Sequence, residues 1–171
     1  MRTTWKLWIL AGVLLLAGTA FAQAEKESAT AFYRLDFVTK ELDDAKVVNS
    51  RTYSLIVADK SNEGNSIRTG TRLPVASSNN PTQYTYVDLG VSIDCRNVKE
   101  LAGQLTLTIS ADISAAAAET GIASSLPPVI RQYKWNSSVI VPLRKATPIY
   151  SSDDLASKHK FQLELTATPI K

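Results

Sequence analysis

The stretch Tyr84-Thr85-Tyr86-Val87-Asp88-Leu89-Gly90-Val91-Ser92-Ile93-Asp94-Cys95 decides the fold class of this 171-residue chain. From Val87 to Cys95 every second residue is apolar, and the residues between them are polar or glycine. Successive side chains of a β-strand point to opposite faces, so the pattern predicts a strand with one buried and one exposed face. An amphipathic helix would space its apolar residues three and four positions apart instead.

The same alternation recurs on both sides of this stretch. Residues 105–113 and 161–167 repeat it cleanly, and less regular versions occupy 33–37, 53–57, 67–75, 133–141 and 149–150. Segments rich in Asp, Asn, Ser, Gly and Pro separate them, as is typical of turns. About eight strands with short connections predict an all-β fold, a single antiparallel β-sandwich or barrel over residues 31–171. Residues 23–30 are expected to form a flexible N-terminal segment.

An apolar strand face can point into a protein core or toward lipid. Outer-membrane barrels carry girdles of aromatic residues at both rims, whereas aromatic residues make up only 8% of this chain. The composition therefore favours a soluble domain over a lipid-facing barrel.

The first 22 residues have the pattern of a secretory signal peptide. Arg2 and Lys6 precede an uncharged apolar run from Leu7 to Gly18, and Ala20-Phe21-Ala22 fits the small-x-small cleavage motif. A membrane anchor is the alternative, but the run is shorter than the ~20 residues of a spanning helix. Cleavage after Ala22 predicts a periplasmic or outer-membrane-associated protein.

The charge of the chain changes once these residues are removed. The whole chain has 19 Lys+Arg and 16 Asp+Glu, a net charge of +3, and residues 1–22 contain two of the basic residues and none of the acidic ones. The mature chain is thus nearly neutral, and its charges are dispersed. A nucleic-acid partner would require a basic stripe with stacking aromatics, so none is expected.

Catalytic and metal-binding chemistry finds little support in the residues. Cys95 is the only cysteine and falls on the apolar face of its strand, where a thiol is inert. His159 is the only histidine, and the sequence pattern identifies no acid or nucleophile to work with it. A closed zinc site is excluded for a monomer by these counts. The chain is therefore expected to be no enzyme and to need no cofactor and no metal.

The segment Ser114–Pro128 is long for a hairpin loop and is rich in small residues. We interpret it either as a mobile loop or as an extended tip that contacts a partner or a membrane surface. Exposed aromatic residues make good contact anchors, and a buried Arg requires an acidic partner or a wet strand end. The candidate partner-contact residues are Tyr84, Tyr86, Arg131, Ile122 and Leu126.

From residue 66 to about residue 152 the order of these features resembles the β-domain of bacterial secretins, the outer-membrane ring channels of type II and III secretion and of type IV pili. The similarity rests on Ile67–Val75 with its Gly and Pro, on Tyr86–Ile93, on Leu105–Ser114, and on the returning segments 128–131 and 139–141. In this resemblance residues 114–128 occupy the place of the membrane-facing lip. Otherwise the chain resembles small uncharacterised exported bacterial proteins.

The resemblance implies an exported, non-catalytic β-domain of the bacterial cell envelope. We expect it to act through protein–protein interaction, with an envelope protein or with further copies of itself, and to make peripheral membrane contact through the 114–128 loop. The alternative is a soluble β-barrel that binds a small ligand, as closed barrels do in their interior. An enzyme centred on Cys95 or His159 is the third and weakest hypothesis.

Overall fold

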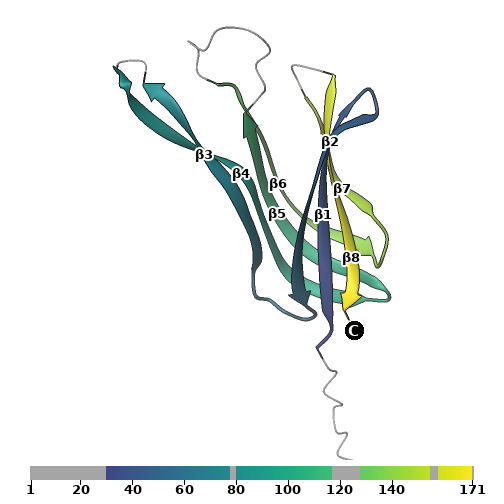
Figure 1. Cartoon of the computed structure of the whole chain (residues 1–171). Helices are drawn as coiled ribbons and strands as arrows, with labels where there is room; N and C mark the ends of the chain where they lie inside the picture. Colours follow the sequence, from purple (N-terminus) through teal and green to yellow (C-terminus); the bar gives the residue numbers. More distant parts are fainter. Residues whose placement is uncertain (1–29, 78–79, 117–127, 155–157, 171) are drawn as a thin grey trace, which may run out of the picture.

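Eight β-strands make up the regular structure of the computed structural model, which describes residues 30–77, 80–116, 128–154 and 158–170. The signal-peptide prediction for residues 1–22 lies outside these residues. Figure 1 shows the strands, which are β1 (Phe32–Asp43), β2 (Lys46–Ala58), β3 (Asn65–Ser77), β4 (Asn80–Leu101), β5 (Gln104–Ala116), β6 (Ile130–Pro142), β7 (Thr147–Asp153) and β8 (His159–Ile170). The all-β prediction is confirmed.

The strands form two four-stranded antiparallel sheets with the orders β2-β1-β8-β7 and β3-β4-β5-β6. Most consecutive strands pair with each other, and β8 returns to pair with β1 along its whole length, from Phe32↔Ile170 to Asp43↔His159. No ladder joins β2 to β3 or β6 to β7 among the described residues. The domain is therefore a sandwich, and the barrel, including the ligand-binding barrel of the alternative hypothesis, is wrong.

The core consists of the alternating faces that the sequence predicts. Buried side chains of β1 and β8 meet those of β4 and β5 across the sandwich. Each fully buried Leu, Ile or Phe contributes about 1.5–3 kcal/mol through apolar burial. The buried apolar residues of the two sheets are Tyr33, Leu35, Phe37, Val57, Phe161, Leu163, Leu165 and Ala167 in one, and Leu89, Val91, Ile93, Cys95, Val98, Leu105, Leu107, Ile109, Ala111 and Val141 in the other.

Side chains seal the side of the sandwich where β6 faces β7. The rings of Tyr133 on β6 and Phe161 on β8 stack with their centroids 4.2 Å apart. The ring of Trp135 lies 5.8 Å from that of Tyr150 on β7. Aromatic pairs of this kind add about 0.5–1.5 kcal/mol beyond their area burial. Packing thus replaces the missing ladder along this side.

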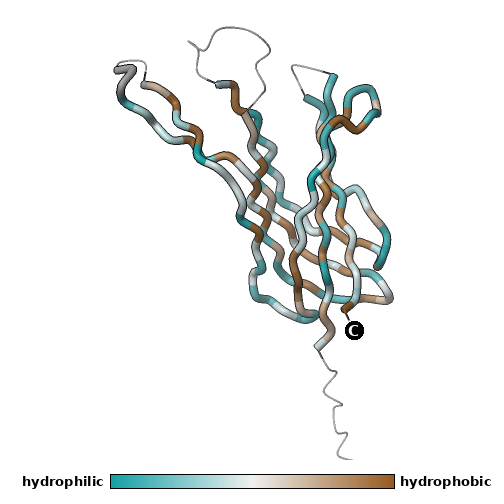
Figure 2. Tube along the Cα trace, in the orientation of Figure 1, coloured by the Kyte–Doolittle hydropathy of each residue, from teal (hydrophilic) through white to brown (hydrophobic). Residues whose placement is uncertain are grey.

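The β3–β4 hairpin leaves the sandwich instead of following it. In Figure 1 its upper half leans away from the β5–β6 hairpin, and Figure 2 shows both apolar and polar stretches along it. β4 pairs with β3 as far up as Asn80, but it pairs with β5 only from Gly90 to Leu101. Gly90 has φ +148°, which a residue with a side chain rarely adopts, and it marks the point of departure.

No helix in the described part of the chain is long and apolar enough to cross a membrane.

Candidate functional site

Two clefts lie on opposite faces of the sheet β3-β4-β5-β6, at the place where β4 separates from β5. The inner cleft, of about 530 Å³, opens between the two sheets. The outer cleft, of about 490 Å³, lies on the face turned away from the other sheet. The two share Leu89, Gly90 and Ser114 in their walls. They are therefore two sides of one gap between hairpins.

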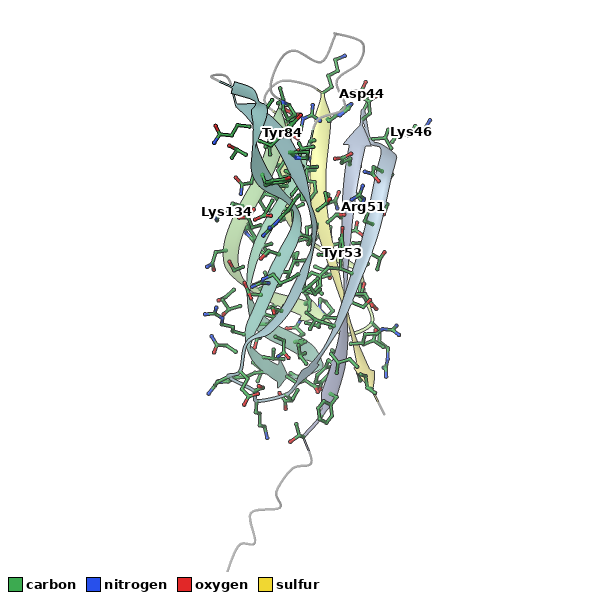
Figure 3. The ribbon with its side chains drawn as sticks, turned by 60° about the vertical axis from the view of Figure 1, so that its left-hand side comes forward. Asp44, Lys46, Arg51, Tyr53, Tyr84 and Lys134 are labelled. Atoms are coloured by element: carbon green, nitrogen blue, oxygen red, sulfur yellow. The ribbon has the colours of Figure 1, made fainter. Side chains whose placement is uncertain are left out.

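The inner cleft combines an apolar wall with a polar one. Leu73, Leu89 and Ile113 line it from the β3–β6 sheet, while Arg51 and Tyr53 line it from β2. Figure 3 shows Arg51 and Tyr53 on the side of β2 that faces the β3–β4 hairpin. The volume falls within the range of small-molecule and peptide pockets.

The polar rim of this cleft is partly fixed by hydrogen bonds. The amide of Asn49 donates to the Glu41 carboxylate over 3.4 Å. The Thr39 hydroxyl, the buried polar group of the region, donates to the Arg51 carbonyl oxygen over 3.4 Å. Two hydrogen bonds thus link β1 to β2 along this wall.

The charged side chains around the outer cleft already have partners. Arg72 Nε lies 2.9 Å from Asp88 Oδ1, and Arg68 Nη2 lies 2.7 Å from Asp94 Oδ1. The Asp112 carboxylate accepts a hydrogen bond from the Gln132 amide over 2.8 Å.

This hydrogen bond is the main reason why the pKa of Asp112 is lowered from its ordinary value, and nearby Lys134 adds to the effect. The outer cleft therefore presents a surface with little net charge.

The candidate contact residues are placed apart from one another. Tyr84 and Tyr86 lie on the outer face of the upper β4, 56% and 64% exposed, so the sequence prediction of exposed aromatics there is confirmed. Arg131 lies on the inward face of β6, and its Nε is 3.3 Å from Asp154 Oδ2, which is the acidic partner that its position requires. Ile122 and Leu126 lie outside the described residues.

The predicted 114–128 loop is shorter than expected. Ser114, Ala115 and Ala116 belong to β5 and pair with Gln132, Arg131 and Ile130 of β6. Small residues have weak strand preference, but the ladder to β6 continues through them and overrides it. The remainder of the segment, residues 117–127, is outside the described part, and its contact with a membrane or partner stays a prediction.

Cys95 and His159 lie in different sheets, on β4 and β8. Cys95 is fully buried, and burial raises the pKa of its thiol to about 12, with the Asp94 carboxylate as a smaller contribution. Half-buried His159 begins β8, and its carbonyl oxygen accepts a hydrogen bond from the Asp154 backbone N–H over 2.8 Å. Within the described ranges no three His, Cys, Asp or Glu residues gather as a metal site would require.

Sequence reasoning missed the gap between the hairpins. Its signal was Gly90, because a glycine in the middle of a strand often marks a bend or a close approach of backbones. Gly70 lies directly opposite it on β3. The pairing that brings these two together cannot be read from either strand separately.

Comparison with known proteins finds likeness at the level of structure. No protein-family model matches the chain, and no curated protein matches it. Among solved structures, the type II secretin GspD of enteropathogenic Escherichia coli aligns with a TM-score of 0.52 and 9% identity, over 83% of this chain and 70% of that one.

Two further secretins align in the same way. GspD of E. coli K12 has a TM-score of 0.52 and 10% identity, over 83% of this chain and 51% of that one. The Klebsiella pneumoniae type II secretion system outer membrane complex, with PulD, PulS and the PulC HR domain, has a TM-score of 0.50 and 11% identity, over 83% and 39%. The chain therefore spans about half or less of the length of these two secretins. The two four-stranded sheets of this protein have a secretin-like fold.

Proposed function

We propose that the chain is an exported, secretin-like protein of the bacterial cell envelope that acts without catalysis, by pairing the edge strands of its sheets with further copies of itself. The proposal is carried by the secretin-like fold of the two sheets, together with the open edges of the sheet β3-β4-β5-β6. Its two outer strands, β3 and β6, each have one side without a ladder partner among the described residues. Unpaired edges of this kind are templates for association.

The direction of the two edges suits a ring. Each neighbouring pair in the sheet is antiparallel, so β3 and β6 run in opposite directions. When β6 of one copy lies beside β3 of the next, the antiparallel pattern continues. Such a contact uses two different surfaces, and contacts of this type close into rings when the rotation between copies permits it.

The edge formed by β6 is well suited to pairing. Its ladder with β5 runs from Gln104↔Pro142 to Ala116↔Ile130 without a shift in register, so no β-bulge interrupts the strand. Proteins usually protect such edges with bulges, prolines or short length. Proline stands on β6 only at the last residue, Pro142. An isolated sheet with this edge would tend to associate.

The lack of catalysis is supported by the state of the only cysteine in the sequence. The Cys95 thiol is buried, and its raised pKa keeps it protonated at neutral pH. The signal-peptide pattern of residues 1–22 supports export.

The native mass of the protein tests the proposal. The full chain is expressed with residues 1–22, so that the cell can process them, and is purified with and without detergent. Light scattering should report a species of many copies in at least one condition. A monomer in both conditions contradicts the proposal.

Two matched variants identify the surface. Ile140→Lys places a charge on the edge strand β6, where Ile140 is 62% exposed. Ile56→Lys does the same on β2, an edge of the other sheet, where Ile56 is 58% exposed. Edge charges oppose strand pairing, so only the β6 variant should reduce the native mass. A reduction by the β2 variant alone would assign assembly to the other sheet.

A further inference from the structure

We propose that the gap between the β3–β4 and β5–β6 hairpins binds an extended peptide segment of a partner protein. The segment pairs with the upper part of β4 as an added strand. Its alternate side chains enter the inner and the outer cleft. This inference is independent of self-assembly through β3 and β6, because it uses a different strand edge.

An unpaired stretch of β4 provides the backbone groups. Between Tyr84 and Leu89, β4 pairs with β3 on one side and with no described strand on the other. An extended peptide that joins an exposed sheet edge obtains its affinity from main-chain hydrogen bonds.

The orientation of these groups follows from Gly90. Its N–H donates to the hydroxyl of Ser114 on β5 over 3.1 Å, so it points into the gap. The register with β3 has no shift between Gly90 and Tyr84. Because strand geometry repeats every two residues, the N–H groups of Asp88, Tyr86 and Tyr84 point the same way. Pro74 lies opposite Tyr86 and has no backbone N–H, so it donates no hydrogen bond to β4 at this position. This agrees with a Tyr86 N–H that points away from β3.

The two clefts determine which side chains fit. A strand lying beside β4 directs its side chains alternately to the two faces of the sheet. On the inner face they meet Leu73, Leu89 and Ile113. On the outer face they meet Arg72 and Asp88, whose charges are paired, with Arg72 Nε 2.9 Å from Asp88 Oδ1. The segment that fits best therefore alternates apolar residues with uncharged polar ones.

Tyr84 and Tyr86 extend the outer surface of the same strand. Both are exposed, and both lie on the face of the outer cleft. Tyrosine supplies a large contact area with few rotatable bonds, which makes it effective in recognition. The aromatic residues singled out in the sequence thus border the peptide.

The probe is a fluorescently labelled peptide of about ten residues that alternates valine and threonine. Fluorescence anisotropy with the purified full chain should show saturable binding. A peptide of the same composition with its valines contiguous should bind about tenfold more weakly, because its side chains no longer alternate between the clefts. Equal binding of the two peptides, or binding of neither, would overturn the proposal.

Backbone pairing is tested by N-methylation of the probe. Methylation of every second amide removes the hydrogen bonds on one side of the strand, and methylation of the intervening amides removes those on the other. One of the two methylated peptides should lose binding and the other should retain it. If both behave alike, the peptide is not held by a ladder to β4.

A matched pair of variants locates the site. Leu73→Asp places a charge in the inner cleft at a half-buried position and should weaken binding about tenfold or more. Ile56→Asp makes the same kind of change on the outer face of the other sheet and should leave binding unchanged. Equal effects of the two would place the peptide elsewhere.

Amide hydrogen exchange supplies a readout that does not depend on the variants. In the free protein the amides of Tyr84, Tyr86 and Asp88 should exchange faster than those of Thr85 and Val87, which face β3. The peptide should slow the first group selectively. Slow exchange of the first group in the free protein would mean that the chain itself covers this edge, which would overturn the proposal.

Discussion

Gly70 and Gly90 lie opposite each other on β3 and β4, and neither has room for a side chain. A Cβ atom on Gly90 would lie 2.1 Å from the Thr69 carbonyl oxygen, and one on Gly70 would lie 2.4 Å from the Leu89 carbonyl oxygen. The two backbones lie close enough to exclude a Cβ atom at the place where the hairpin leaves the sandwich. The bend of the β3–β4 hairpin therefore depends on two glycines that are distant in the sequence.

Replacement of Gly90 by alanine should destabilise the domain. Both the clash of an added Cβ atom with the Thr69 carbonyl oxygen and the φ of +148° oppose a side chain, so we expect Gly90→Ala to lower the free energy of unfolding by more than about 2 kcal/mol in urea denaturation. Gly64→Ala is the control, because its Cβ would meet only the Arg96 side chain, at 3.6 Å. Equal stability of the two variants would show that the bend carries no strain.

Removal of the ring at Tyr133 should weaken the sealed side of the sandwich. Tyr133→Leu keeps an apolar side chain but loses the stack on Phe161, so the free energy of unfolding should fall by about 1 kcal/mol. Tyr86→Leu removes an exposed ring and should change stability by less than about 0.5 kcal/mol. Thermal denaturation of the two variants in parallel measures the difference.

Cys95 should be inaccessible to thiol reagents while the protein is folded. The thiol is buried, and its pKa near 12 leaves almost no reactive thiolate at pH 8. A disulfide reagent should modify it at the rate of unfolding, and immediately in denaturant. Rapid modification of the native protein would place Cys95 at an accessible surface, contrary to its position on the inward face of β4.

Alkaline pH should destabilise the fold. Burial raises the pKa of the Cys95 thiol from 9.0 to about 12, and burial together with its hydrogen bond to Glu100 raises that of Tyr33 from 10.0 to about 12. Between pH 9 and pH 12 the unfolded chain releases these protons and the folded chain retains them, so stability falls as pH rises. Cys95→Ala should make the fall less steep, and an unchanged slope would exclude the thiol as a cause.

The sequence predicts well which side chains share a strand face, but it predicts poorly which strands pair with each other. Alternation identifies Ile93, Cys95 and Leu107 as inward residues because period two assigns every side chain to one face. It does not determine which strands pair, so a sandwich and a barrel remain equivalent until β2 and β3 are seen to be separate. Pairing also decides that Ser114 to Ala116 belong to a strand, although their composition is that of a loop.

In the candidate site, too, the sequence predicts which face a residue occupies but not which strands lie side by side. Tyr84 and Tyr86 are recognisable as exposed because they occupy the polar face of a regular strand. The gap beside them depends on where β4 stops pairing with β5, at Gly90↔Ser114, and that is a relation between segments 24 positions apart. Local pattern carries no information on such a relation.

The aromatic seal between β6 and the opposite sheet gives the sandwich an uneven resistance to opening. Tyr133 and Phe161 stack on one side, whereas the inner cleft opens between Arg51 and Leu73 on the other side and reaches inward as far as Phe161. Regions with few buried contacts open at lower free energy than the rest of a domain. Thermal fluctuations should therefore separate the sheets from the β2–β3 side, with the aromatic side as the axis, and the cleft would widen and narrow without unfolding the core.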